Sequence, residues 1–204
     1  MDSVKQVRAL SVPFDQVNVD TDQLTPARFM GRINAREPMD GILFHDLRYD
    51  SEGAERPEFI LNQAPFREAK ILVGNSNFGC GSSRETAVWA LKDHGFTAVI
   101  APSFGDIFHS NAAKNGLLAV RLSVEQCAEI REVLRSQPGT ELTVDLESQS
   151  VYVHDGRNEA LAFEFDAFQK HCLLEGLDDL GITQEHAETI EQYEHQHRQQ
   201  LSWL

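Results

Sequence analysis

The sequence predicts an α/β fold, in which a parallel core of strands and helices is joined to a second, β-rich layer. The first observation is that short apolar, β-branched segments alternate with helical patterns over residues 70–136. The second is that residues 141–164 contain short strand patterns with a hairpin turn signal at Asp155-Gly156. The third is that no linker rich in proline, serine or glycine divides the chain, and 41% of its residues are hydrophobic. We therefore expect a single domain, residues 1–204, around one sizeable core.

The parallel core is predicted from strand patterns and from the helices between them. The strand patterns are Lys70–Gly74, Thr97–Ala101 and Leu117–Arg121. The helices carry start or stop signals: Gly95 after Glu85–His94, Ser103 and Asp106 at the start of Ser103–Asn115, and a Ser123–Gln126 capping box in a helix that Pro138-Gly139 ends. Such a series makes a parallel sheet with right-handed crossovers, and ligands bind beyond the carboxyl ends of its strands.

The two ends of the chain differ from this core. Residues 13–65 lack sustained periodicity, and long irregular segments inside compact domains are often functional. Asp166–Glu175 is predicted as a helix stopped by Gly176, and residues 183–204 as a helical tail that is polar and exposed to about Gln199. We expect Val7–Val12 to join the β-rich layer, whose strand patterns are Glu141–Leu146, Ser150–His154 and Leu161–Glu164.

Composition excludes several classes of function. The net charge of −14 argues against nucleic-acid binding, because phosphate contacts need clustered lysine and arginine. No apolar run is long enough to span a membrane, and the N-terminus has no signal-peptide h-region. Cys80, Cys127 and Cys172 are too far apart for a cluster or zinc motif, and their odd number indicates a reducing compartment. We expect a cytoplasmic protein that ligates no metal alone.

Residues 77–85 (NFGCGSSRE), here called the elbow, are the most informative segment of the chain. Two glycines let the backbone approach a ligand closely, two hydroxyls follow, and Arg84 closes the segment where a helix begins. The N–H groups and the dipole of that helix favour a carboxylate or an oxyanion. Two interpretations remain open: Ser82 caps the helix in a capping box with Glu85, or Ser82 acts as a base beside Arg84.

Three further segments accompany the elbow: NVDTDQ at residues 18–23, APSFGDIF at 101–108 and DAF at 166–168. Together with the elbow they resemble the small subunit of bacterial 3-isopropylmalate dehydratase, which is similar to the swivelling domain of aconitase, and the likeness runs from Val12 to about Glu188. The resemblance implies a three-layer β/β/α swivelling-type fold. It implies a hydro-lyase that isomerises 2-isopropylmalate and 3-isopropylmalate by dehydration and rehydration in leucine biosynthesis. It also implies a large subunit that completes the site and carries a [4Fe-4S] cluster.

The resemblance also implies roles for single residues. Ser82 matches the catalytic base, and Arg84 matches the group that holds a substrate carboxylate and favours the alkoxide. Gly81 and Ser83 belong to the segment that binds the substrate. Thr21 and Asp22 match a pair that supports the active-site histidine of the large subunit.

A second arginine for the distal carboxylate is implied about a dozen residues after that pair. The candidates are Arg36, Arg32 and Arg28, in that order, because one sequence does not determine the length of the loop. The alternative for each is a solvated surface arginine.

The sequence departs from the family pattern beside the elbow. Thr86 stands where the family usually has histidine, and Ser76-Asn77 stands where it usually has a Glu-Asn pair. A second hypothesis is therefore a dehydratase subunit for another hydroxy-dicarboxylate, such as a methyl-substituted malate. A third is a non-enzymatic module that uses the elbow to hold an anion.

Two other features are weaker candidates. Cys80 lies where a helix end could lower the pKa of a thiol, but it has no histidine partner nearby in the sequence and is predicted to be structural. His195 and His197 are metal-ligand types in a polar tail, without a third ligand in the pattern, and are predicted to be solvated.

Overall fold

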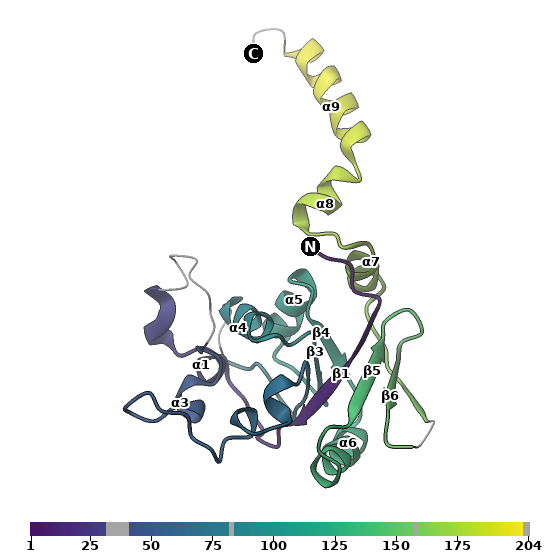
Figure 1. Ribbon diagram of the computed structural model, residues 1–204. Helices are drawn as coiled ribbons and strands as arrows, with labels where there is room; N and C mark the ends of the chain where they lie inside the picture. Colours follow the sequence, from purple (N-terminus) through teal and green to yellow (C-terminus); the bar gives the residue numbers. More distant parts are fainter. Residues whose placement is uncertain (32–40, 82–83, 157–158, 202–204) are drawn as a thin grey trace.

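The computed structural model describes residues 1–31, 41–81, 84–156 and 159–201, and within them the strands form one seven-stranded mixed sheet (Figure 1). The strand order is β4-β3-β2-β1-β5-β6-β7. The strands from β1 to β4 pair in parallel, whereas the pairs β1–β5, β5–β6 and β6–β7 are antiparallel. Their bounds are β1 Gln6–Pro13, β2 Ile71–Val73, β3 Ala98–Ala101, β4 Leu118–Arg121, β5 Glu141–Asp145, β6 Ser150–Val153 and β7 Ala160–Ala162.

Strand β1 joins the parallel core to the β-rich part of the sheet. Its residues Ser11–Pro13 pair with β2, and its residues Gln6–Leu10 pair with β5. The predicted α/β class is therefore confirmed, and so is the prediction that Val7–Val12 joins the β-rich strands. These strands continue the sheet from the other edge of β1.

The parallel strands are covered by helices on both faces. Figure 1 shows α4 (Thr86–His94) and α5 (Asp106–Lys114) on one side of these strands and α6 (Val124–Ser136) on the other. Side chains of a strand alternate between its two faces. One core, with α4 and α5, contains Leu72, Val99 and Ala119, and the other, with α6, contains Ile71, Ala98 and Leu118.

Helices α6 and α4 begin differently. The predicted capping box of α6 is confirmed, because Ser123 Oγ accepts a hydrogen bond from the N–H of Gln126 at 3.1 Å. Helix α4 has Glu85 at its N-cap and no side-chain cap. The interpretation in which Ser82 is the N-cap and Glu85 its capping-box partner is therefore wrong, and Ser82 itself lies outside the described residues.

The predicted start of α5 at Ser103 is also wrong. The N-cap is Gly105, and the Ser103 hydroxyl instead accepts a hydrogen bond from the N–H of Asn77 at 2.8 Å. A contact between distant segments has thus overridden a local capping signal. It ties the segment after β3 to the elbow.

The segment between β1 and β2 is irregular, as its lack of periodicity predicted. Its described part contains the short helices α1 (Thr21–Leu24) and α3 (His45–Arg48) and the 3-10 turns η1 (Ala27–Phe29), η2 (Ile60–Asn62) and η3 (Phe66–Glu68). The ring of Phe14 stacks on that of Phe44 at 4.8 Å, which holds this segment on the core.

The C-terminal region has the predicted helix after Asp166, but the single tail helix predicted from residue 183 is two helices in the structure. Helix α7 (Ala167–Glu175) is capped by Asp166 and ends at Gly176 in the left-handed conformation. Helices α8 (Asp179–Gln184) and α9 (Ala187–Gln200) follow and have no buried residue, and Figure 1 shows α9 projecting away from the sheet. Among the described residues, no helix is long and apolar enough to cross a membrane.

Candidate functional site

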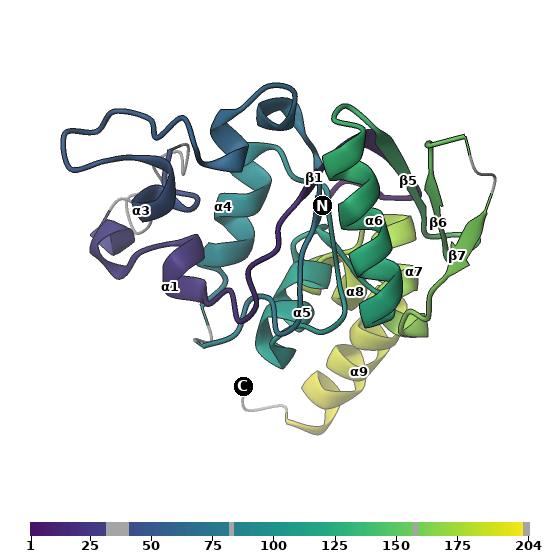
Figure 2. The ribbon, with the colours of Figure 1, turned by 90° about the horizontal axis from the view of Figure 1, so that it is seen from below.

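The elbow is joined by backbone hydrogen bonds to the segment that leads into α1. The carbonyl of Val19 accepts hydrogen bonds from the N–H groups of Gly79 and Cys80, at 2.7 and 3.2 Å. In return, the N–H of Thr21 donates to the carbonyl of Cys80 at 2.8 Å. Two segments that are distant in the sequence therefore lie side by side, and Figures 1 and 2 both show α1 next to α4.

A capping box defines the start of α1. The carboxylate of Asp20 accepts a hydrogen bond from the N–H of Gln23 at 2.7 Å, and the Gln23 side chain accepts one from the N–H of Asp20 at 3.1 Å. Thr21, the first residue of the helix, is buried, and the side chain of the next residue, Asp22, is 62% exposed. The predicted Thr21-Asp22 pair thus lies beside the elbow.

Close approach requires a glycine at Gly79, whereas at Gly81 it is the positive φ that favours glycine. Gly79 has φ +72°, and a Cβ atom there would lie 2.2 Å from Cγ of Phe108 in α5. Gly81 has φ +105° and lies against Asp20 and Thr21, where a Cβ atom would stand 3.5 Å from the Thr21 hydroxyl. Both backbones are in a region that favours glycine, and both pack against another element.

Arg84 and Asp22 form an ion pair across the junction between the elbow and α1. Nη2 of Arg84 donates to Oδ1 of Asp22, and the two residues are 62 positions apart in the sequence. The Arg84 side chain is 29% exposed. The structure therefore brings together Thr21, Asp22, Gly81 and Arg84, whereas Ser82 and Ser83 lie outside the described residues.

Of the three candidate arginines in the loop, only Arg28 lies within the described residues. Arg36 and Arg32 lie outside the described residues. Arg28 binds Asp46 through both ends of its guanidinium, with Nη1 2.9 Å from Oδ2, and lies over the ring of Phe29 at 4.7 Å. The hydrogen bond from Arg28 lowers the pKa of the Asp46 carboxyl below its ordinary value. Arg28 therefore already has a carboxylate partner within the chain.

The backbones of the residues that depart from the family pattern, Ser76 and Thr86, make hydrogen bonds beside the elbow. The carbonyl of Ser76 accepts a hydrogen bond from the N–H of Asn18 at 3.0 Å, and the Asn77 amide donates to the side-chain oxygen of Asn18 at 2.8 Å. Thr86 is buried, and its carbonyl accepts a hydrogen bond from the Thr25 hydroxyl at 3.4 Å. These hydrogen bonds link the residues on either side of the elbow to the segment between β1 and α3.

Sequence reasoning missed the role of Asn18 as a link between the two loops. Asn18 and Asn77 both have positive φ, 54° and 61°. Asparagine tolerates this conformation better than most residues, so a pair of loop asparagines was the available signal. Their contact could not be inferred without the tertiary structure.

The thiols do not make a ligand set for an iron–sulfur cluster. Cys80 is half-buried in the elbow, while Cys127 and Cys172 are buried in α6 and α7. Burial raises the pKa of the Cys127 thiol to about 11 and also raises that of Cys172. Among the residues with described positions, no three histidine, cysteine or acidic side chains are grouped to hold a metal ion. The three thiols and the other described residues therefore do not fit a cluster.

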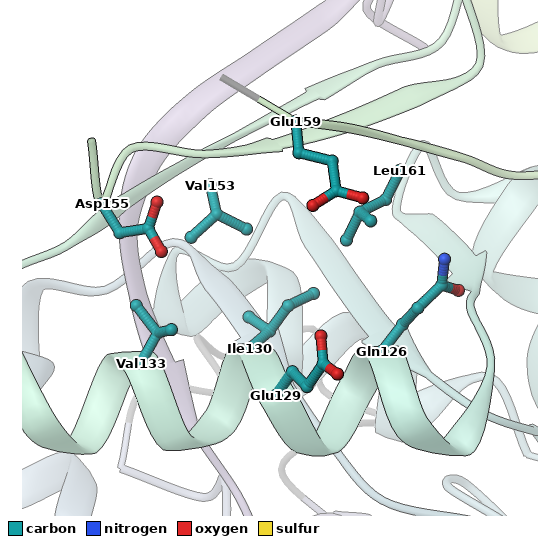
Figure 3. A pocket seen from close by; sticks show the side chains of 8 residues that line it. All are labelled: Gln126, Glu129, Ile130, Val133, Val153, Asp155, Glu159 and Leu161. Atoms are coloured by element: carbon teal, nitrogen blue, oxygen red, sulfur yellow. The ribbon is translucent and has the colours of Figure 1, made fainter. Parts of the chain in front are cut away.

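A pocket on another part of the surface has the wrong charge for a dicarboxylate. It lies between α6 and the strands β6 and β7, and Figure 3 shows the carboxylates of Glu129, Asp155 and Glu159 around an apolar lining that includes Ile130 and Leu161. These carboxylates would repel a dianion. The elbow is therefore the better candidate for an anion site.

Comparison with known proteins gives consistent matches. The aconitase C-terminal domain family model matches residues 1–125, and the LeuD_N model matches residues 128–167. The chain is 43% identical to the 3-isopropylmalate dehydratase small subunit of Roseobacter denitrificans, with 100% of both chains covered. It is 46% identical to the protein of that name from Gluconobacter oxydans, over 100% of this chain and 96% of the relative.

A solved structure supports the fold. The crystal structure of a 3-isopropylmalate dehydratase (leuD) from Methanocaldococcus jannaschii superimposes with a TM-score of 0.65 at 22% identity, covering 92% of this chain and 99% of the other. At this identity the likeness supports the fold alone.

Proposed function

Because this chain belongs to the family of 3-isopropylmalate dehydratase small subunits, we propose that it is the small subunit of a hydro-lyase that interconverts 2-isopropylmalate and 3-isopropylmalate. The reaction removes water to give 2-isopropylmaleate and adds it back at the neighbouring carbon, as a step of leucine biosynthesis. The observation that carries this proposal is the junction of the elbow with α1. It places Arg84, Gly81, Thr21 and Asp22 together in a chain with full-length relatives of that name.

Arg84 is the residue that we assign to a substrate carboxylate. Its guanidinium is partly exposed at the elbow, beside the start of α4, and a guanidinium grips a carboxylate through two parallel N–H bonds. A permanent positive charge there also favours the negative charge that develops when a proton is removed from the carbon next to that carboxylate.

Ser82 is the residue that we assign to the proton transfer, on the strength of its place between Gly81 and Arg84 in the sequence. As an alkoxide, its Oγ takes the proton in dehydration and, once protonated, returns it in rehydration. Serine is a weak base, so this role depends on stabilisation of the alkoxide by Arg84. Ser83 and the backbone of Gly81 are assigned to substrate binding.

The leaving hydroxyl calls for a Lewis acid, which we assign to a [4Fe-4S] cluster on an aconitase-like large subunit. The dispersed thiols of this chain support that division of labour. We propose that the two subunits work together in the cytoplasm and that one of the loop arginines, Arg36 or Arg32, binds the distal carboxylate.

A second candidate is the same reaction on another hydroxy-dicarboxylate, such as a methyl-substituted malate. Thr86 and Ser76 support it, because both depart from the family pattern and both lie next to the elbow. A third candidate is a non-enzymatic module that binds an anion at Arg84.

Co-expression with a cluster-bearing large subunit distinguishes the three candidates. The anaerobic complex should dehydrate 3-isopropylmalate, followed by the ultraviolet absorbance of the unsaturated product. Turnover of a methyl-substituted malate alone would favour the second candidate. Failure to form a complex with any such subunit would overturn the enzymatic proposal.

A further inference from the structure

The side chain of Asp22 is exposed, but the residue is held by contacts of the backbone next to it and of its own carboxylate. The residue before it donates its N–H to the carbonyl of Cys80, and the Asp20–Gln23 capping box fixes the turn of helix that contains it. Its carboxylate accepts a hydrogen bond from Arg84. Asp22 is thus linked to the elbow through the backbone of its neighbour Thr21 and through its own carboxylate.

We infer that Asp22 is a positioning residue for Arg84, in addition to any contact it makes with a partner subunit. This inference rests on the proposed function, because it concerns the arginine assigned to the substrate carboxylate. The ion pair restricts the guanidinium before the substrate arrives, and a preorganised fork loses less freedom on binding than a mobile one.

The alternative is that Asp22 competes with the substrate for Arg84. A carboxylate whose side chain is 62% exposed is screened by water, so its removal would strengthen the attraction of Arg84 for an anion by at most about fivefold. Freeing the rotamers of an arginine side chain costs up to about twentyfold in binding. The limit for the loss of order is the larger of the two, and the direction of the change in kcat/KM distinguishes positioning from competition.

The ion pair has little part in stability. Ion pairs with this degree of exposure contribute little to folding, and the capping box of α1 does not use the Asp22 side chain. Replacing Asp22 should therefore change catalysis without changing the melting temperature.

Four variants of the assembled enzyme test this inference. They are Asp22→Asn, Asp22→Glu, Arg84→Lys and the Asp22→Asn/Arg84→Lys double variant. Asp22→Asn should lower kcat/KM about three- to tenfold. The loss should be divided between a lower kcat and a higher KM in the same proportion as in Arg84→Lys. Asp22→Glu, which keeps the carboxylate, should have a kcat/KM close to that of the unmodified enzyme. In the Arg84→Lys background, Asp22→Asn should change kcat/KM by less than about twofold.

Glu55→Gln is the matched control. It breaks another exposed pair, in which Glu55 Oε2 lies 2.5 Å from Arg67 Nη2, and it should leave both kinetic constants unchanged. A lower KM in Asp22→Asn, or additive effects in the double variant, would overturn the inference in favour of competition or of an independent role for Asp22.

A second measurement does not depend on turnover. In the full-length chain without a partner, the Nε–H resonance of Arg84, assigned by its loss in Arg84→Lys, should show restricted motion that Asp22→Asn removes and Glu55→Gln retains. An unchanged resonance in Asp22→Asn refutes positioning even if the complex is active. Loss of restricted motion in Asp22→Asn, with a complex inactive on every diacid, would instead refute the proposed function and leave the positioning role standing.

Discussion

Replacing Gly79 by alanine forces a methyl group into the space that the Phe108 ring occupies. The new Cβ would stand 2.2 Å from Cγ and 2.6 Å from Cδ2 of that ring, and Phe108 is buried and packed against Phe78 and Phe104. The ring has no open space to move into, so the overlap costs about 1–3 kcal/mol. The left-handed backbone of Gly79 adds about 1–2 kcal/mol for a residue with a Cβ. The total loss of unfolding free energy is about 2–5 kcal/mol.

Gly53→Ala separates these two contributions. Gly53 has a similar φ of +82°, with nothing within 4 Å of an added Cβ, so the substitution there costs only the backbone strain. Thermal and urea unfolding of both variants should show Gly79→Ala melting about 2–12 °C below Gly53→Ala. Equal melting temperatures would refute the argument that the elbow is packed onto α5 through Gly79.

The remaining predictions concern the site, the cofactor and the tail. Ser82→Ala should leave subunit association intact while turnover of the assembled enzyme falls roughly a hundredfold, and near-normal turnover would remove Ser82 from the mechanism. Arg84→Lys should chiefly lower kcat and Arg36→Lys should chiefly raise KM, whereas equal, mild effects would place both arginines on the surface. The isolated chain should bind no iron, and anaerobic reconstitution of a stoichiometric cluster on it would contradict the assignment to a large subunit. Truncation after His186 should change the melting temperature by less than about 2 °C, because α9 buries no residue, and a larger loss would show that the tail packs on the core.

Local signals in the sequence predicted those parts of the fold that local chemistry decides. The capping box at Ser123, the glycine stop at Gly176 and the alternation of strands and helices from β2 to α6 are each decided by neighbouring residues, and the structure confirms them. The predicted extent of α4, Glu85–His94, agrees with the structure to within one residue, whereas the predicted start of α5 was wrong. The side chain expected to cap α5, Ser103, binds the elbow instead, and a competing tertiary partner cannot be seen in a local pattern.

The sequence identified candidate residues for the site but not their arrangement. The resemblance pointed to Thr21, Asp22, Gly81 and Arg84, and the structure brings them together through backbone hydrogen bonds between Val19 and the elbow. Those bonds join backbone N–H and carbonyl groups, which nearly every residue has, so they cannot be predicted from residue type. The contact between Arg84 and Asp22 follows from them and was not anticipated.

The negative charge of the chain opposes the binding of a dicarboxylate, and the ion pairs of its arginines bear on how such a ligand could bind. A chain with a net charge of −14 has to bind a dianion, and two of its candidate arginines already have acidic partners: Asp22 for Arg84 and Asp46 for Arg28. Each pair is close to neutral at a distance, so it adds little to the long-range attraction of a dicarboxylate. For Arg84, which uses Nη2 in its bond to Asp22, the proposed benefit of pairing is a guanidinium whose orientation is restricted before it binds substrate. Capture of the substrate by this subunit therefore depends on the geometry of close contacts, and positive charge that acts over longer distances has to come from other arginines of the loop or from the large subunit.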